Sequence, residues 1–140
     1  MIVADTSFFV ALGNQNDQYH QLAVQVLNTL NEALVTTYPV ITETCYLLSR
    51  WGGNNAQCSF LREVAQEAFE VFDLRSYHVT RMVELMEKYV DLPMDMADAS
   101  LVVLAEHLGH GRILTLDQRD FNTYRWNNSN PFKNLLLNFA

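Results

Sequence analysis

Four acidic residues stand at positions where the surrounding sequence is mostly apolar. Asp5 follows Met-Ile-Val-Ala, Glu43 lies in an otherwise uncharged stretch, Asp98 begins the run Ala-Ser-Leu-Val-Val-Leu-Ala, and Asp117 directly follows Arg-Ile-Leu-Thr-Leu. A carboxylate in apolar surroundings is costly unless it is paired or bound to a cation. Four such residues predict one shared site, and a cluster of carboxylates favours a hard divalent cation such as Mg²⁺ or Mn²⁺.

The predicted elements bring these four residues to the same edge of a sheet. Asp5 and Asp117 come at the ends of predicted strands, and sites in open α/β sheets form at the carboxyl ends of the strands. Asp98 lies at the start of a predicted helix, where the helix dipole favours a negative charge, and Glu43 lies inside another. Each position also has a simpler interpretation: a cap or turn for Asp5 and Asp117, a helix-terminal charge for Asp98, and a solvated helix face for Glu43.

Strand and helix patterns alternate along the rest of the chain. This alternation predicts parallel pairing, and therefore an α/β fold: a three-layer sandwich with a central parallel sheet of four to five strands flanked by helices. A length of 140 residues suits a single domain, 1–140. Strands are expected at 1–5, 34–37, 69–74, 113–116 and 135–139, and helices at 6–13, 19–30, 39–51, 54–68, 79–90 and 96–108.

Composition limits the class of protein. The chain is 49% hydrophobic and 18% charged, which is typical of a globular protein, and no apolar run approaches the ~20 residues that a membrane helix needs. Two cysteines without a CxxC motif and the lack of a signal-peptide pattern predict a cytoplasmic location. A net charge of -7 disfavours passive electrostatic binding of nucleic acid, but it does not exclude an enzyme that acts on a polyanion.

Divalent cations held by carboxylates suit the hydrolysis of phosphodiesters. They lower the pKa of a water molecule, orient it for in-line attack and stabilise the leaving oxygen, so no nucleophilic side chain is needed. The sequence lacks the GxxxxGK[ST], GxSxG, HExxH and paired CxxC motifs. Metal-assisted hydrolysis is therefore the chemistry that these residues favour.

Four segments carry a family resemblance, in order and at ordinary spacing. They are Val3-Ala4-Asp5-Thr6-Ser7, Thr42-Glu43, Asp95-Met96-Ala97-Asp98-Ala99-Ser100 and Leu114-Thr115-Leu116-Asp117-Gln118-Arg119-Asp120-Phe121. Together they resemble the four motifs of PIN-domain ribonucleases, and most closely those of VapC-type toxins of type II toxin–antitoxin pairs. The resemblance extends from Ile2 to about Phe121.

The resemblance implies Mg²⁺- or Mn²⁺-dependent endonucleolytic cleavage of RNA, a homodimer and a small antitoxin protein that covers the acidic site. It implies metal ligands at Asp5 and Asp98. Glu43 is then a direct or water-mediated ligand or helps to activate the attacking water, and Asp117 completes the quartet. Asp120 and Asp95 are secondary candidates, for which a surface or capping role is the alternative.

Other polar residues near these motifs are weaker candidates. Thr6 or Ser7 could bind a phosphate or a metal-bound water, or could cap the helix that follows. Arg112, Arg119 and Arg125 are expected to flank the acidic edge, where they could hold RNA phosphates, with solvated surface arginines as the alternative.

Two other functions compete with the ribonuclease hypothesis. A phosphoaspartyl protein is disfavoured, because Asp5-Thr6-Ser7 lacks a second aspartate and no late-strand lysine is present. The other alternative is a noncatalytic PIN-like interaction module that keeps the fold without the chemistry. The intact acidic quartet argues against it, since a degenerate site is expected to have lost at least one carboxylate.

Overall fold

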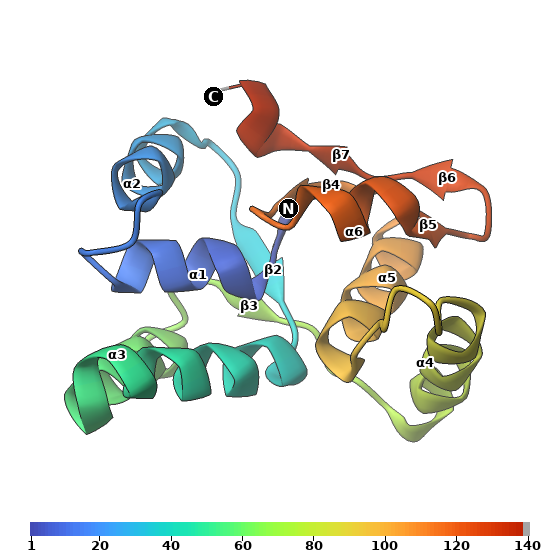
Figure 1. The fold of residues 1–140 in the computed structure, drawn as a ribbon, viewed down its shortest axis with the longest axis horizontal. Coiled ribbons are helices and arrows are strands. Elements are labelled where there is room, and N and C mark those ends of the chain that lie inside the picture. The colour runs from blue at the N-terminus through green and yellow to red at the C-terminus, as the bar shows by residue number, and fades with distance from the viewer. Residues whose placement is uncertain (139–140) are drawn as a thin grey trace.

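A five-stranded parallel sheet forms the centre of the computed structural model, which describes residues 1–138 (Figure 1). Every neighbouring pair of strands is parallel, so the predicted three-layer sandwich with four to five parallel strands is confirmed. The strands lie in the order β3-β2-β1-β4-β7, with bounds Glu70–Val71, Leu34–Thr36, Ile2–Ala4, Arg112–Leu114 and Lys133–Asn134.

The middle strand is apolar because both of its faces are covered by helices. All three residues of β1 are buried, as expected for a parallel strand between two helical layers. Val3 pairs with Val35 of β2 on one side and with Ile113 of β4 on the other. β1 and β4 therefore end side by side, and Asp5 and Asp117 follow them.

Within residues 1–138, six α-helices surround the sheet (Figure 1). α1, α2 and α3 gather on one side and α4 and α5 on the other, with α1 packed against α2 and α3, and α4 against α5. None of the helices in the described part of the chain is both long and apolar enough to cross a membrane. Their bounds are Thr6–Gly13 (α1), His20–Thr29 (α2), Tyr38–Ala65 (α3), Ser76–Lys88 (α4), Met96–Leu108 (α5) and Gln118–Thr123 (α6).

α3 bends sharply at the glycine pair that the sequence marks as a break. Gly53 has φ 68° and ψ -162°, a conformation that is essentially limited to glycine. The segment after the bend packs back through an aromatic cluster. The ring of Phe9 lies 5.4 Å from that of Phe60 and 4.8 Å from that of Phe69. These contacts hold α1 against α3, and α1 begins at the site.

The end of the chain differs from the sequence prediction. Residues 135–138 form a 3₁₀ helix, so the strand expected there is wrong, and Phe139 lies outside the described residues. The sheet edge is instead β7, which stops at Asn134. The side-chain amide of this residue donates to the carbonyl of Thr115 (2.8 Å), and its Oδ1 accepts from the amide of Thr115 (3.3 Å). Because the side chain takes over the pairing with β4, the backbone is free to turn.

An antiparallel ribbon precedes β7, and the sequence patterns did not predict it. β5 (Arg125–Trp126) pairs with β6 (Asn130–Pro131). Asn127 and Asn128 have φ 48° and 66°, which asparagine tolerates better than most residues. The ribbon and α6 therefore form a compact connection between β4 and β7.

Candidate functional site

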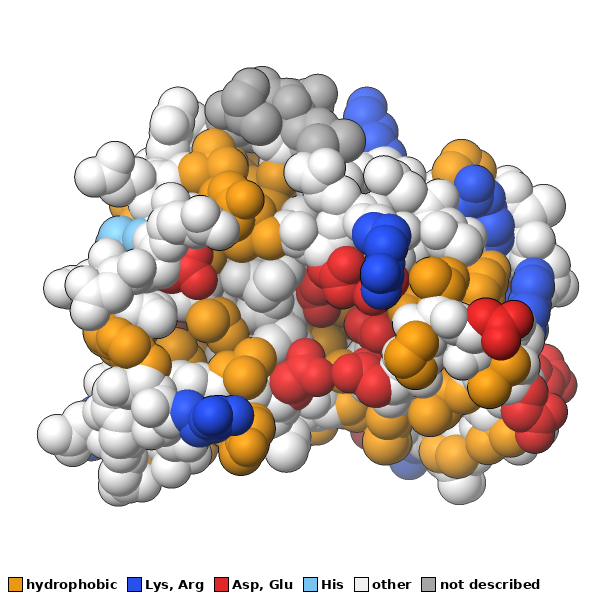
Figure 2. Space-filling model, in the orientation of Figure 1, with side chains coloured by type: hydrophobic (Ala, Val, Ile, Leu, Met, Phe, Trp, Pro, Cys, Tyr) orange, Lys and Arg blue, Asp and Glu red, His pale blue; other side chains and the backbone are white. Residues whose placement is uncertain are grey.

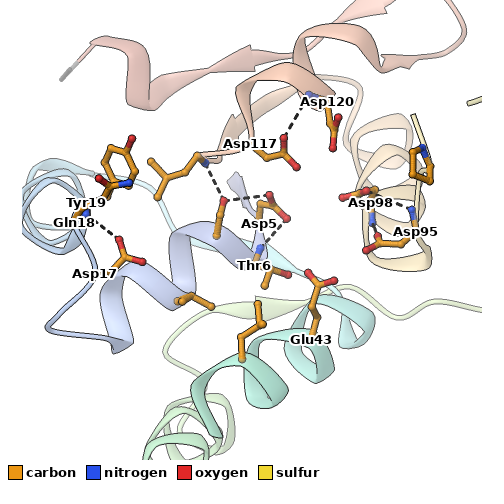
Figure 3. A pocket seen from close by; sticks show the side chains of 15 residues that line it. Asp5, Thr6, Asp17, Gln18, Tyr19, Glu43, Asp95, Asp98, Asp117 and Asp120 are labelled. Atoms are coloured by element: carbon orange, nitrogen blue, oxygen red, sulfur yellow. Dashed lines mark hydrogen bonds between the residues drawn. The ribbon is translucent and has the colours of Figure 1, made fainter. Parts of the chain in front are cut away.

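A pocket of about 540 Å³ opens at the carboxyl ends of β1 and β4. Figure 2 shows acidic side chains around a central hollow of the surface, and Figure 3 shows that they converge from separate elements. All four acids of the predicted quartet line this pocket, and the two secondary acids line it as well. They are Asp5 at the end of β1, Glu43 on α3, Asp95 and Asp98 at the start of α5, and Asp117 and Asp120 at the start of α6.

Asp5 is the most enclosed of these acids, with a relative exposure of 5%. Its Oδ1 accepts from the amide of Thr6 at 2.7 Å, so Asp5 itself is the N-cap of α1. The cap expected at Thr6 or Ser7 therefore lies one or two residues earlier, at Asp5. Oδ2 of Asp5 accepts from the hydroxyl of Thr115 at 2.7 Å and from that of Ser7 at 3.3 Å. Both oxygens are thus held in fixed directions.

Two hydroxyl groups join the ends of β1 and β4 behind Asp5. The amide of Leu116 donates to Oγ of Ser7 (2.9 Å), and the amide of Asp117 donates to Oγ1 of Thr115 (2.9 Å). These bonds fix the chain between β4 and α6 relative to the first turn of α1. The hydroxyl of Ser7 therefore connects the residue that follows β1 with the segment that follows β4. Ser7 also lines the pocket.

Asp98 and Asp95 cap the same helix through reciprocal bonds. The amide of Asp98 donates to Oδ1 of Asp95 at 2.8 Å, and the amide of Asp95 donates to Oδ2 of Asp98 at 3.4 Å. A buried hydroxyl pair, Thr37 Oγ1 with Ser100 Oγ at 2.6 Å, ties the start of α5 to the start of α3. Asp95 is therefore a capping residue, as its alternative interpretation held, and it is also part of the pocket wall.

Asp117 and Asp120 stand on the short helix α6. Asp117 is its N-cap, and its carboxylate accepts from the amide of Asp120 at 3.5 Å. Arg119 is exposed, and its Nε lies 3.3 Å from Oδ1 of Asp120. Its position beside the acidic pocket agrees with the expectation that it flanks this edge.

Glu43 reaches the pocket from the first part of α3, with its side chain directed toward Thr6 in Figure 3. Thr6 is buried, and its Oγ1 has no hydrogen-bond partner of normal geometry among the described residues. Burial is the main influence on the pKa of Glu43 and raises it, and nearby Asp95 raises it further. The hydroxyl of Thr6 lies close enough to Glu43 to oppose part of this increase. An unsatisfied buried hydroxyl beside a carboxylate indicates a position for a polar ligand.

Acidic residues line the pocket and, within the described part of the chain, no basic residue does, so the pocket carries an excess of negative charge. Burial raises the pKa of Asp5 from 3.8 to about 6, against the opposing effect of its hydrogen bonds from Thr115 and Thr6. Burial also raises the pKa of Glu43 and of Asp98, with further increases from Asp95 and Asp5. The pKa of Asp117 is raised by burial and then by its neighbour Asp120. A bound cation is one way to relieve this repulsion.

The donor set fits a hard divalent cation. The pocket offers carboxylate and hydroxyl oxygens and no cysteine or histidine, as Mg²⁺ and Mn²⁺ prefer. Within residues 1–138, no three acidic, histidine or cysteine side chains already lie close enough together to hold an ion. In this arrangement the carboxylates of Asp98 and Asp117 each accept from a backbone amide, that of Asp95 and that of Asp120.

Two of the expected RNA-binding arginines lie elsewhere. Arg112 begins β4, at the end of the strand opposite to the pocket, and its guanidinium pairs with Glu32 at 2.5 and 2.8 Å. The expectation that it flanks the acidic edge is wrong, because the edge lies after the strand and Arg112 precedes it. Arg125 is the first residue of β5, and its side chain donates to the carbonyls of Asn122 and Tyr124 at 2.7 and 2.9 Å.

Several residues of the site carry no signal in the sequence. Thr115 and Tyr124 are fully buried and donate to the carboxylates of Asp5 and Asp98, respectively. Asp17 and Tyr19 line the pocket from the loop before α2. The position of Thr115 directly before a strand-end acid could have suggested its role, but nothing in the sequence indicates that Tyr124 reaches another helix.

Comparisons with known proteins agree with this geometry. A family model described as PIN domain matches residues 2–127. Ribonuclease VapC26 of Mycobacterium tuberculosis (strain ATCC 25618 / H37Rv) is 31% identical over 124 residues, which cover 89% of this chain and 92% of the relative. The chain therefore belongs to the PIN-domain family, within which it is similar to VapC-type ribonucleases.

Two solved structures share the fold. One is the crystal structure of Mycobacterium tuberculosis VapC20, described as a sarcin-ricin loop cleaving toxin, with a TM-score of 0.79 at 22% identity. That match covers 84% of this chain and 91% of VapC20. The other is a toxin–antitoxin complex from Klebsiella pneumoniae, with a TM-score of 0.64 at 15% identity and coverage of 88% and 92%. At these identities the likeness is one of fold.

Proposed function

We propose that this protein is a divalent-metal-dependent endoribonuclease that acts as the toxin of a toxin–antitoxin pair. The single observation that carries the proposal is the convergence of all six predicted carboxylates, from four elements, on one pocket at the carboxyl ends of β1 and β4. Family membership and the likeness to VapC26 support RNA as the substrate.

Asp5, Glu43, Asp98 and Asp117 are the residues that would hold Mg²⁺ or Mn²⁺. When bound, such an ion supplies positive charge and Lewis acidity toward the phosphodiester. Asp120 and Asp95 contribute further negative charge at the pocket wall. Although burial raises the pKa of Asp5 to about 6, this value still lies below neutral pH, so the carboxylate is mostly ionised there.

The remaining groups of the pocket position the substrate and the acids. Ser7 and Thr115 hold Asp5 through hydroxyl bonds, and the buried hydroxyl of Thr6 lies beside Glu43 at the pocket wall. Arg119 stands exposed beside Asp120 and can bind a phosphate on the approach to the pocket. Glu43 is half-buried with a raised pKa, which suits a group that accepts a proton from an attacking water.

The partners are part of the same proposal. The toxin–antitoxin complex from Klebsiella pneumoniae has this fold, which supports a small antitoxin as a partner of this chain. The homodimer implied by the resemblance, the cytoplasmic location and the treatment of residues 1–140 as one domain also remain proposals.

Induced expression in a bacterial host tests this function. We expect growth arrest and new RNA 5′ ends at defined positions, mapped by sequencing of RNA ends, and neither effect from Asp98→Asn at equal protein level. Asp91→Asn, which changes an exposed acid outside the pocket, serves as the matched control and is expected to behave like the wild type. Equal RNA ends from the wild type and Asp98→Asn would favour the noncatalytic interaction module instead.

A further inference from the structure

Tyr124 is a fully buried tyrosine that reaches from the end of α6 to the start of α5. Its hydroxyl donates to Oδ2 of Asp98 at 3.2 Å. Its own amide donates to the carbonyl of Asp120 at 2.9 Å. One residue therefore connects the two helices that carry four of the seven acids of the pocket.

The ring of Tyr124 is held from two sides. It packs edge-on against Phe121, with ring centroids 5.2 Å apart at 85°, and against Tyr89, with centroids 5.1 Å apart at 69°. Tyr89 in turn accepts from the amide of Arg125 at 3.1 Å. Since buried aromatic pairs of this geometry have few alternative positions, the hydroxyl of Tyr124 is fixed in place.

The two hydrogen bonds to the carboxylate of Asp98 end on the same oxygen. Tyr124 donates to Oδ2, and so does the backbone amide of Asp95 at 3.4 Å. Among residues 1–138, no hydrogen bond reaches Oδ1 of Asp98. One oxygen is thus anchored by protein donors, and the other is the one available to a ligand.

We propose that Tyr124 is a positioning residue that fixes the carboxylate of Asp98, so that Oδ1 is presented to the cation while Oδ2 is held by the protein. This inference rests on the proposed function, since it assigns Asp98 to the metal site. Partners that hydrogen-bond to a metal-ligating carboxylate orient it, and their loss typically weakens metal binding 10- to 100-fold.

Tyr124→Phe tests the inference, because it removes the hydroxyl and keeps the ring. We expect calorimetric titration with Mn²⁺, without RNA, to show binding weakened by about 10-fold or more relative to the wild type. Tyr89→Phe is the matched control, because it also removes a hydroxyl from this aromatic cluster, but one that does not donate to Asp98. The Mn²⁺ affinity of this variant should stay within about twofold of the wild type.

The outcomes separate the inference from the function on which it rests. A wild type that binds no Mn²⁺ would contradict the metal-dependent function itself. A wild type and a Tyr124→Phe variant that bind Mn²⁺ equally tightly, or a Tyr89→Phe variant that loses as much affinity, would contradict the role of Tyr124 alone.

A structure of the wild type with Mn²⁺ bound gives a second test that needs no variant. We expect the ion on Oδ1 of Asp98 and the hydroxyl of Tyr124 still within hydrogen-bond distance of Oδ2. An ion bound to the same oxygen that accepts from Tyr124, or a Tyr124 hydroxyl that has moved out of reach of Asp98, would overturn the inference. This test holds even if Tyr124→Phe does not fold.

Discussion

The ionised carboxylate of Asp5 should destabilise the metal-free protein. Burial raises the pKa of Asp5 from 3.8 to about 6, a difference of about 2.2, which corresponds to about 3 kcal/mol at neutral pH at 1.36 kcal/mol per pKa unit. The side chain is almost completely buried, so solvent does not screen this cost. Asn has nearly the same shape and no charge, but its NH₂ group, which would stand in the place of Oδ2, cannot accept from the hydroxyl of Thr115. We therefore expect Asp5→Asn to recover about 1–2 kcal/mol at pH 7.5.

The sign of the pH dependence follows from the direction of the shift. The folded state binds the proton of Asp5 more tightly than the unfolded state does, so the stabilising contribution is fully present below pH 3.8. It is lost as the pH rises through about 6. Between pH 5 and 7.5, Asp5 alone should lower the free energy of unfolding by about 1 kcal/mol.

Urea denaturation in EDTA at pH 5 and pH 7.5 measures this effect. The loss of stability between the two pH values should be smaller in Asp5→Asn than in the wild type by at least about 1 kcal/mol, because removing the charge of Asp5 also lowers the pKa of Glu43 and of Asp98. Asp91→Asn is the control and should leave the loss unchanged. An Asp5→Asn protein that is less stable than the wild type at pH 7.5, with the same pH dependence, would refute the reasoning.

Three further predictions concern the residues around the site and the far edge of the sheet. Thr115→Val removes a donor to Asp5 and should cost about 1–3 kcal/mol at pH 7.5 but less at pH 5, where Asp5 is mostly protonated, as urea denaturation would show. Gly111→Ala places a Cβ 2.5 Å from Nε1 of Trp126 and should cost about 1–3 kcal/mol, with a lower midpoint in thermal unfolding as the measurement. Hydrogen bonds from Arg112 and from the N-terminal amine lower the pKa of Glu32 from 4.5 to about 2. The contribution of Glu32 to stability is therefore present above pH 4.5 and is lost as the pH falls toward 2. Glu32→Gln should flatten acid unfolding monitored by circular dichroism over that range, and an unchanged acid limb would contradict this assignment.

The sequence predicts the fold well because its strands are short, apolar and separated by helices. A parallel sheet needs strands that are buried on both faces, and β1, β2 and β4 are apolar throughout or nearly so. The bend of α3 is also predictable, since Gly53 adopts a backbone conformation that other residues avoid. Local patterns are sufficient wherever burial and backbone conformation decide the structure.

The last part of the chain shows where local patterns fail. The apolar residues from Leu135 resemble a strand, but Asn134 occupies the pairing groups of Thr115 with its side chain and ends the sheet there. This competition depends on a contact between residues 19 positions apart, which no local pattern contains. The expectation for Arg112 fails for a different reason: sites form at the carboxyl ends of strands, and Arg112 lies at the start of β4.

The acids of the site are predictable and their supporting groups are not. Asp5, Asp98 and Asp117 stand out because they interrupt apolar sequence at strand ends and helix starts. Thr115 and Tyr124 have ordinary types for buried positions, and only the folded chain brings their hydroxyl groups to the carboxylates. Charge in an apolar run is visible in a sequence, whereas a long-range hydrogen bond is not.

Cleavage of RNA by purified protein tests the central claim most directly. Wild-type protein with Mn²⁺ should produce discrete fragments from a broad transcript pool, and excess EDTA should abolish them. Asp5→Asn should cleave nothing under the same conditions, and its expected higher stability would exclude unfolding as the reason. Equal cleavage by the wild type and Asp5→Asn, or cleavage that persists in EDTA, would contradict the account of the acidic pocket as a metal-dependent ribonuclease site.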